Sequence, residues 1–379
     1  MEFPLEVYSL IARHVERPTD LRTLCLVSKG SRRAAERALY RKLDVRELST
    51  TTMLCRILAE QPRLSQLVIS LTISLNEELR GDSGTNFKEQ KILTPLSDSD
   101  YWTSVSKALQ KTTRLRSLRI YVDNGIPSKH AWILSGCSFQ LHTFHCDLAW
   151  DAHLIFFLSE QRKLFDLRIS DFNEENPENV SISTHSLRQA RTLPSLSILD
   201  CTFTEAVGVF VPGRPVTHVK TCFSSSNPEA KRVELALLLA DLRLSTQPLR
   251  SLTVADEAYT TAFSLELLSS LVKAFGLSPQ LRYVGPLALP VDGRERLVFY
   301  GYLARLRGLR SAELDVSEWE PRPESFAALR GLARELHLFV PSIVTLIFVR
   351  DLEPTVLRAA NGLWQVADDI IADTLWRIP

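Results

Sequence analysis

The chain has 379 residues, of which 45% are hydrophobic and 23% are charged, and its formal net charge is +1. This composition is typical of a protein with a buried core, and the small net charge argues against a nucleic-acid-binding surface. The six cysteines show no C-x-x-C spacing and no signal peptide is recognised, which favours reduced thiols and a cytoplasmic and/or nuclear location. No uncharged apolar run is long enough to predict a membrane span.

The first 45 residues predict three short helices. Pro4 suits the first turn of the first helix, which carries apolar residues at helical spacing: Val7, Leu10, Ile11 and Val15. Pro18 is expected to end this helix, Asp20 to cap the second and Ser28 to cap the third. Because helices of about ten residues are unstable alone, the three must pack together or against a partner.

From residue 46 onward, a segment of the form L-x-x-L-x-[LIV] keeps returning. It starts at Leu64, Leu115, Leu141, Leu164, Leu196, Val216, Leu249, Leu281, Leu309 and Ile343. Helical stretches lie between these segments, at residues 101–110, 151–161, 233–242, 265–275 and 296–306. Repeated strand–helix units predict an α/β fold over residues 46–379, a degenerate leucine-rich-repeat-like solenoid with a curved parallel sheet. Residues 355–376 are expected to form a long amphipathic helix that caps the last repeat.

The opening stretch resembles an F-box, a three-helix module of about 40 residues through which substrate receptors dock on the Skp-type adaptor of SCF ubiquitin ligases. The residues that carry the resemblance are Phe3-Pro4, Glu6-Val7, Ile11, Val15, Asp20-Leu21, Leu24, Val27-Ser28-Lys29 and Leu39-Tyr40. An F-box followed by leucine-rich-like repeats is a common arrangement in this family, and the stretch from Leu24 is similar to fungal members. The chain departs from the family pattern at Ser31, where Trp is common, and at Gly30, a glycine within a helix.

The resemblance implies a non-enzymatic substrate receptor, whose F-box at residues 1–45 binds the Skp-type adaptor and, through it, a cullin. The residues that it assigns to adaptor binding are Phe3, Pro4, Val7, Ile11, Leu24, Val27 and Lys29. Leu21 and Leu39 suit the adaptor interface and the packing of the three helices equally well. The alternative function is that of a leucine-rich-repeat interaction scaffold without a ligase role, and Ser31 motivates it.

The repeat pattern also predicts where an unknown protein substrate would bind. Successive side chains of a strand face opposite sides, so the third, fifth and seventh positions of each segment should line the concave face of the sheet. The expected substrate-binding residues are Arg119, Tyr121, His145, Asp166, Arg168, Asp200, Lys220 and Tyr283. The alternative is that these residues form only the exposed, polar side of a sheet.

Motifs for catalysis or for cofactor binding are not found in the sequence. G-x-x-x-x-G-K-[ST], G-x-G-x-x-G, G-x-S-x-G and H-E-x-x-H do not occur. Cys137, His142, His145 and Cys146 are the one metal-like cluster, but His145 and Cys146 should face opposite sides of a strand. We therefore expect no enzyme, no cofactor and no metal site.

Basic residues between Arg32 and Lys42 are expected to form a solvated helix face, with no nucleic-acid or membrane partner.

Overall fold

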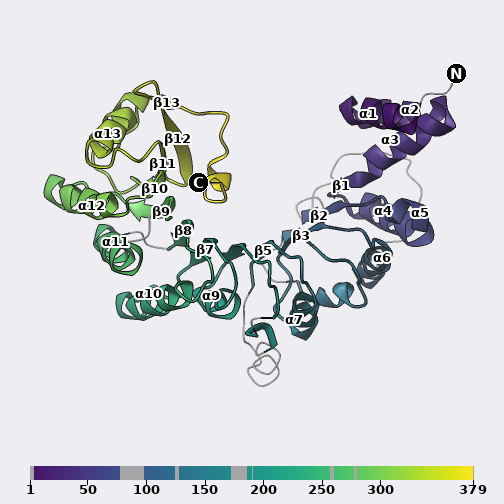
Figure 1. Cartoon of the computed structure of the whole chain (residues 1–379), viewed down its shortest axis with the longest axis horizontal. Helices are drawn as coiled ribbons and strands as arrows, with labels where there is room; N and C mark the ends of the chain where they lie inside the picture. Colours follow the sequence, from purple (N-terminus) through teal and green to yellow (C-terminus); the bar gives the residue numbers. More distant parts are fainter. Residues whose placement is uncertain are drawn as a thin grey trace, which may run out of the picture. The chain divides into compact units, whose positions relative to one another are not determined.

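The computed structural model describes residues 4–76, 98–123, 128–171, 186–189, 191–256, 260–276 and 280–378. The chain divides into two compact units, Met1–Leu193 (unit 1) and Pro194–Pro379 (unit 2). Both units are α/β, with strands and helices alternating along the chain (Figure 1). The predicted α/β class and the largely parallel pairing of strands are confirmed.

Unit 1 begins with the three predicted helices, α1 (Leu5–His14), α2 (Pro18–Val27) and α3 (Lys29–Arg41). Ser28 caps α3 as predicted, because its Oγ accepts a hydrogen bond from the backbone N–H of Ser31 at 3.1 Å. The predicted cap at Asp20 is wrong, since α2 begins at Pro18 and Asp20 already lies in its first turn. Proline at the first helical position has the backbone angle that the helix needs and lacks an N–H that would go unbonded, so Pro18 starts α2.

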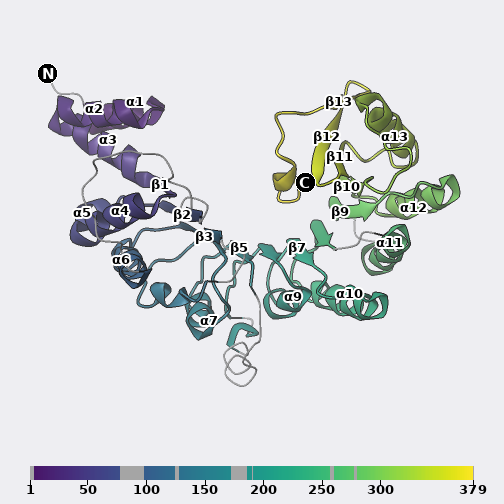
Figure 2. The same ribbon diagram turned by 180° about the vertical axis from the view of Figure 1, so that it is seen from behind.

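The sheet of unit 1 is parallel, and each strand pairs with the next one along the chain. Its strands are β1 (Lys42–Val45), β2 (Ser70–Asn76), β3 (Ser117–Asp123), β4 (Thr143–Cys146) and β5 (Asp166–Ile169). The connecting helices are α4 (Leu48–Glu60), α5 (Pro62–Ser65), α6 (Asp98–Lys111), a 3₁₀ turn (Ala131–Leu134) and α7 (Ala152–Ser159). Figures 1 and 2 show α4, α6 and α7 on the same side of these strands.

Unit 2 continues the same alternation and ends in an antiparallel hairpin. Its parallel strands are β6 (Ile198–Cys201), β7 (His218–Cys222), β8 (Ser251–Ala255), β9 (Tyr283–Ala288), β10 (Ser311–Asp315) and β11 (Thr345–Arg350). The hairpin strands are β12 (Glu353–Ala360) and β13 (Leu363–Val366). The helices are α9 (Thr204–Phe210), α10 (Pro228–Leu242), α11 (Thr261–Phe275), α12 (Gly293–Arg305), α13 (Phe326–Phe339) and α14 (Ala372–Leu375).

The predicted repeat segments match the strands in all cases but the first. Each later segment begins two residues before a strand, from Leu115 before β3 to Ile343 before β11. The first prediction is wrong by four residues: Leu64 lies in α5, and the pairing of Ser70 with Ser117 places the start of that segment at Val68, which is fully buried. A proline at position 62 starts a helical turn there, which moves the strand toward the carboxyl end.

One strand was missed by the sequence pattern. β1 follows α3 directly, and its segment begins with Tyr40 in place of leucine, as Tyr40-x-x-Leu43-x-Val45. Leu43 pairs with Leu71 of β2 in the same register as the later repeats. The last residues of the predicted 1–45 module therefore belong to the sheet, and no linker separates α3 from it.

The prediction of a long helix over residues 355–376 is wrong. Residues 353–366 form the β12–β13 hairpin, and only Ala372–Leu375 are helical. Asn361 and Gly362, with φ of 51° and 76°, connect the two strands. Asn-Gly is the residue pair best suited to a two-residue hairpin turn with positive φ at both positions, so the sequence held a signal that helical spacing obscured.

Apolar residues at the first, fourth and sixth segment positions form the cores of both units. Leu115, Leu118 and Ile120 of one segment are each at most 1% exposed. Burial raises the pKa of three thiols in these cores, Cys55, Cys146 and Cys201, to about 12. A thiol with so high a pKa stays protonated and unreactive at neutral pH.

This burial predicts the pattern of cysteine alkylation. Iodoacetamide at mildly alkaline pH is expected to leave Cys55, Cys146 and Cys201 of the folded protein unmodified, because thiolates are the reacting species. All six cysteines should react in concentrated guanidinium chloride, and mass spectrometry of tryptic peptides distinguishes the two conditions. Rapid labelling of the three buried thiols in the folded protein would contradict the described cores.

The two hairpin turns of unit 2 predict that glycine has opposite effects on stability at corresponding positions: introducing it in one turn should stabilise the fold, and removing it from the other should destabilise it. The β11–β12 turn places Leu352, with φ of 68° and 91% exposed, where the β12–β13 turn has Gly362. Leu352→Gly is expected to raise the free energy of unfolding by about 0.5–1 kcal/mol, because relief of the left-handed backbone outweighs the entropy cost of glycine. Gly362→Ala is expected to lower it by about 1 kcal/mol. Thermal denaturation of both variants tests this, and midpoints that shift in the same direction would disprove it.

Candidate interaction surfaces

Small side chains form the core of the three-helix module, which we define as α1, α2 and α3. Its fully buried members are Ala12, Leu21, Ala34 and Ala35, and the half-buried side chains around them are Tyr8, Val15, Leu24, Cys25, Ala38 and Leu39. Alanine lets the helices approach closely, but its burial removes little apolar area from water. This core therefore contributes little to the stability of the module. Leu21 and Leu39 both contribute to packing within the module.

The two departures from the F-box pattern have structural roles. Ser31 is 5% exposed, and its hydroxyl donates a hydrogen bond of 2.7 Å to the carbonyl oxygen of Leu24, which joins α3 to the end of α2. Gly30 lies under the ring of Tyr8: a Cβ at position 30 would stand 2.7 Å from Cε2 of that ring. A side chain at position 30 would therefore displace Tyr8, which explains a glycine in the first turn of α3.

Large apolar side chains outside this core are exposed. On α1, Val7, Leu10 and Ile11 are 37%, 58% and 44% exposed and follow helical spacing on the side away from the core residue Ala12. At the end of α2, Leu26 and Val27 are 86% and 68% exposed. We call these five residues the apolar surface of the module. Single exposed apolar residues are ordinary, but several on helices this short make this surface a candidate interaction site.

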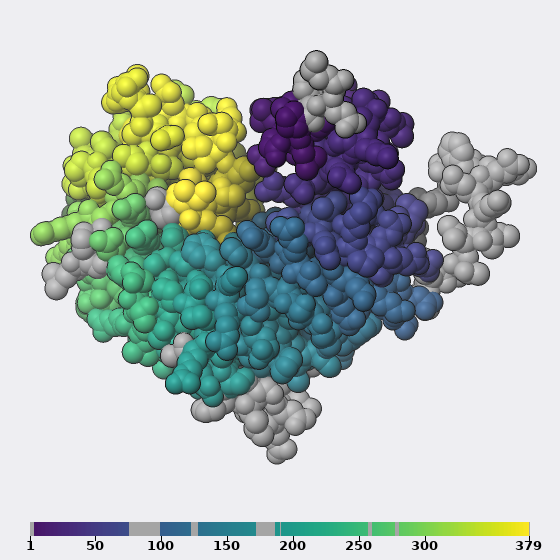
Figure 3. Space-filling model, turned by 45° about the vertical axis from the view of Figure 1, so that its right-hand side comes forward, coloured from purple at the N-terminus to yellow at the C-terminus, as the bar shows by residue number. Residues whose placement is uncertain are grey.

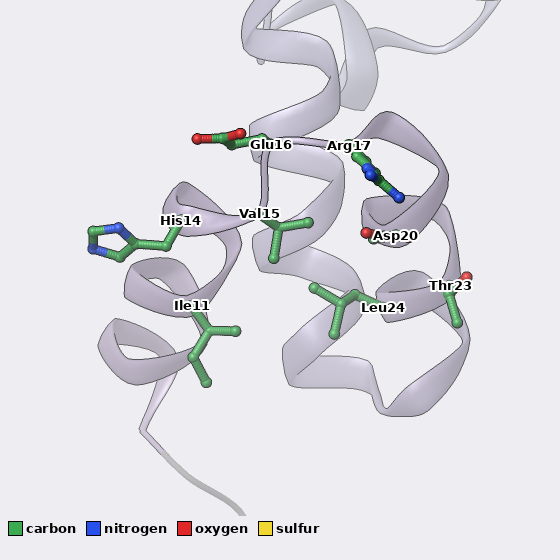
Figure 4. Close-up of a pocket in the computed structure, with 8 residues that line it drawn as sticks. All are labelled: Ile11, His14, Val15, Glu16, Arg17, Asp20, Thr23 and Leu24. Atoms are coloured by element: carbon green, nitrogen blue, oxygen red, sulfur yellow. The ribbon is translucent and has the colours of Figure 1, made fainter.

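A groove between α1 and α2 lies next to this surface (Figure 4). Its volume is about 610 Å³, and it is lined by Ile11, His14, Val15, Glu16, Arg17, Asp20, Thr23 and Leu24. Two predicted adaptor-binding residues, Ile11 and Leu24, therefore reach the same groove from different helices. A second groove, between α1 and α3, contains Leu10 and three arginines, Arg13, Arg37 and Arg41.

The structure places most of the predicted adaptor-binding residues at the surface. Pro4 is exposed immediately before α1, Val27 is exposed at the end of α2 and Lys29 is exposed at the start of α3. Leu24 is half-buried, and Phe3 lies outside the described residues. Leu10 and Leu26 were not predicted, although Leu10 shares the helical spacing of Val7 and Ile11.

A buried carboxylate fixes the module to the rest of unit 1. Glu36 of α3 is 8% exposed and accepts hydrogen bonds from Arg32 Nε at 3.0 Å and from Arg63 Nη2 of α5 at 3.1 Å. The bonds from Arg63, and then those from Arg32, hold the pKa of Glu36 below its ordinary value. Together with the direct passage from α3 into β1, this contact holds the module in a defined position on the repeats.

Five of the predicted substrate-binding residues come together on the sheet of unit 1. Arg119, His145 and Arg168 are paired neighbours on β3, β4 and β5. His145 Nδ1 lies 3.4 Å from the hydroxyl of Tyr121, and His145 Nε2 lies 3.2 Å from Asp166 Oδ2. These neighbours cover His145, which is only 7% exposed, so its predicted exposure is wrong. Arg119, Tyr121 and Asp166 are half-buried and Arg168 is exposed.

In unit 2 the predicted face is largely covered by the chain itself. Asp200 is 9% exposed and Tyr283 is 1% exposed, whereas Lys220 is half-buried. Arg377 pairs with Asp200 at 3.1 Å, and Trp376 packs in one cluster with Tyr283. The expectation that Asp200 and Tyr283 are open to a partner is therefore wrong. The repeat pattern identifies the face of a side chain, but it does not show that a distant segment returns to cover that face.

The metal-like cysteine and histidine residues are arranged as the strand register predicts. Cys146 is 1% exposed in the core, while His145 lies on the opposite face between Tyr121 and Asp166. Within the described ranges, no group of three or more His, Cys, Asp or Glu side chains is placed to hold a metal ion. The same ranges contain no helix with the length and apolar character needed to cross a membrane.

Two comparisons with known proteins found no match. No protein-family model matches this chain, and no curated protein shows significant similarity.

The Glu36 contact predicts a pH-dependent contribution to the stability of unit 1. Glu36→Gln is expected to lower its free energy of unfolding by about 1–2 kcal/mol at neutral pH, because hydrogen bonds to a charged group are lost. A carboxyl with a lowered pKa stabilises the fold above its unfolded pKa of about 4.3 and stops doing so as the pH falls through its folded value. The difference between wild type and variant should therefore disappear in acid.

Thermal denaturation at a series of pH values measures this difference. Glu60→Gln is the matched control, since Glu60 is an exposed carboxylate at the end of α4. A control that loses as much stability as Glu36→Gln, or a difference that persists in acid, would contradict the role of Glu36.

Proposed function

We propose that this protein is a substrate-receptor subunit of an SCF-type ubiquitin ligase. In this proposal the three-helix module is an F-box that docks on a Skp-type adaptor and, through it, a cullin. The α/β repeats form a leucine-rich-repeat-like solenoid that holds a protein substrate, and catalysis belongs to other subunits. The observation that carries the proposal is the exposure of Val7, Ile11 and Val27, at positions that the resemblance assigns to the adaptor interface.

The energetics of the module support docking. Its alanine-rich core buries little area, while the larger side chains of the apolar surface remain in water. Full burial of a Val, Leu or Ile side chain contributes about 1.5–3 kcal/mol relative to full exposure. Burial of this surface in a partner's groove would therefore offset the entropy lost on association and complete the core of the module.

The rigid attachment of the module supports the receptor role. A substrate receptor acts by proximity, because it raises the effective concentration of substrate near the ligase. That mechanism benefits from a fixed geometry between the adaptor-binding end and the substrate-binding face. The continuity of α3 and β1 and the Glu36–Arg63 contact provide such a connection within unit 1.

The sheet of unit 1 is the part of the predicted concave face that best suits a substrate. Arg119, Tyr121 and Arg168 lie on neighbouring strands, and Arg168 is exposed. Arginine and tyrosine are frequent anchors of protein interfaces. We propose a protein substrate for this face, in a cytoplasmic and/or nuclear setting.

Ser31 does not favour the alternative function, a repeat scaffold without a ligase role. Its small side chain is accounted for by burial and by the hydrogen bond to Leu24. A scaffold that binds partners only through its sheet would have no need for exposed Leu26 and Val27 on α2.

Co-purification with a Skp-type adaptor tests the proposal. Wild type is expected to retain the adaptor, and Val27→Asp or the pair Val7→Asp and Ile11→Asp should reduce retention by at least about tenfold, because each places a charge in a desolvated interface. Leu338→Asp is the matched control, since Leu338 is 81% exposed on α13 of unit 2. Circular dichroism establishes that each variant is folded. Failure of wild type to bind the adaptor, or equal retention by Val27→Asp, would rule out the docking role.

A further inference from the structure

The C-terminal segment, residues 367–378, lies on the sheet face of unit 2 that the helices leave free. Figure 1 shows α10 to α13 on one side of the strands and the end of the chain on the other. Trp376 is 3% exposed and packs in one cluster with Ile198, Tyr283, Ile347 and Val356. In Figure 3 the C-terminal residues, in yellow, rest against the surface of the same unit drawn in green and teal.

Trp376 and Arg377 make two defined contacts in this interface, and Ala367, Ile370, Ala372 and Leu375 of the same segment also pack against the cluster. The guanidinium of Arg377 lies 4.4 Å from the ring centroid of Trp376 and pairs with Asp200 at 3.1 Å. Its side chain is 18% exposed, and that of Asp200 is 13% exposed. Elsewhere in the segment, Ile371 and Ile378 are 69% and 80% exposed. The segment therefore contributes one buried aromatic ring and one paired cation, the side chains that most often dominate interfaces, alongside its partly buried apolar residues.

Two features of the segment favour its release. Its helix α14 has four residues and no side-chain cap, which is too short to be stable without its anchor. Burial raises the pKa of Glu313 on β10, and the negative charge of Asp373 on α14 acts in the same direction, so the two carboxylates repel each other.

We propose that this face of unit 2 is a peptide-binding site for a large aromatic residue followed by an arginine or lysine, and that the C-terminal segment fills it in cis. The apolar cluster around Tyr283 holds the ring, and Asp200 selects the cation. The segment competes with a partner peptide for the same site as a tethered ligand. A partner peptide therefore binds when it fits the site better than the segment does, or when its local concentration is high. The site is independent of adaptor docking by the three-helix module.

The test uses full-length protein and a fluorescent peptide of residues 367–379. In the opened variant, Trp376→Ala with Arg377→Ala, the site is expected to be empty and to bind the peptide in trans. Wild type should bind it at least about 30-fold more weakly, because its own anchor occupies the site. A control peptide carrying the same two alanines should not bind the opened variant. Absence of peptide binding to a folded opened variant, or equal binding to wild type, would overturn the proposal.

A charge exchange tests the role of Asp200. Asp200→Arg in the opened variant should abolish binding of the wild-type peptide and restore binding of a peptide with Arg377→Asp. A face that binds any apolar segment would accept both peptides equally, and that result would disprove the specificity. A peptide with Asp373→Asn should bind several-fold more tightly than the wild-type peptide, because the repulsion with Glu313 is removed.

Hydrogen exchange on wild type keeps the proposal testable if the opened variant does not fold. Backbone amides of residues 372–378 are expected to exchange by local opening, much faster than those of β9, β10 and β11. Protection of the segment equal to that of these strands would show that it is a fixed part of the core and would overturn the proposal.

Discussion

A single strand–helix repeat cannot bury its own apolar side, and this constraint determines the rest of the structure. Before the final hairpin, strands within each unit pair in parallel with the next along the chain, and residues such as Leu118 and Ile120 of β3 are buried between neighbouring repeats. The backbone of a parallel array also leaves hydrogen-bonding groups open at its edges. In unit 2 the sheet ends in the β12–β13 hairpin, whose positive-φ turns reverse the chain.

The same constraint shapes the beginning of unit 1. The three helices contribute a core made mostly of alanine, and they gain their defined position from α3, which passes directly into β1, and from the Glu36 contact with Arg63. A module held in this way leaves several large apolar residues outside its own packing. Val7, Leu10, Ile11, Leu26 and Val27 remain at the surface, and we read that surplus as the adaptor interface.

Two faces with the same predicted role therefore differ in the structure. On unit 1 the polar side of the sheet keeps an exposed arginine, Arg168, above a histidine that Tyr121 and Asp166 hold in place. On unit 2 the corresponding side carries apolar residues, Ile198 and Ile347, and the C-terminal segment covers them. The proposed binding of a substrate by unit 1 and the proposed self-occupied peptide site on unit 2 are compatible, because the two faces have different chemistry.

Local spacing alone determined much of this protein: the three N-terminal helices, the alternation of strands and helices, and the face on which each strand residue lies. These features depend on residues close in sequence, such as Ser28 before α3 or the segment that starts at Leu115, and so they could be predicted. The role of Gly30 under Tyr8, the anchoring of Glu36 by Arg63 and the covering of Asp200 by Arg377 could not, because each joins residues that only packing brings together. Burial of one segment by another depends on the shapes of whole faces, and the tertiary structure alone decided which of the predicted binding residues remain open.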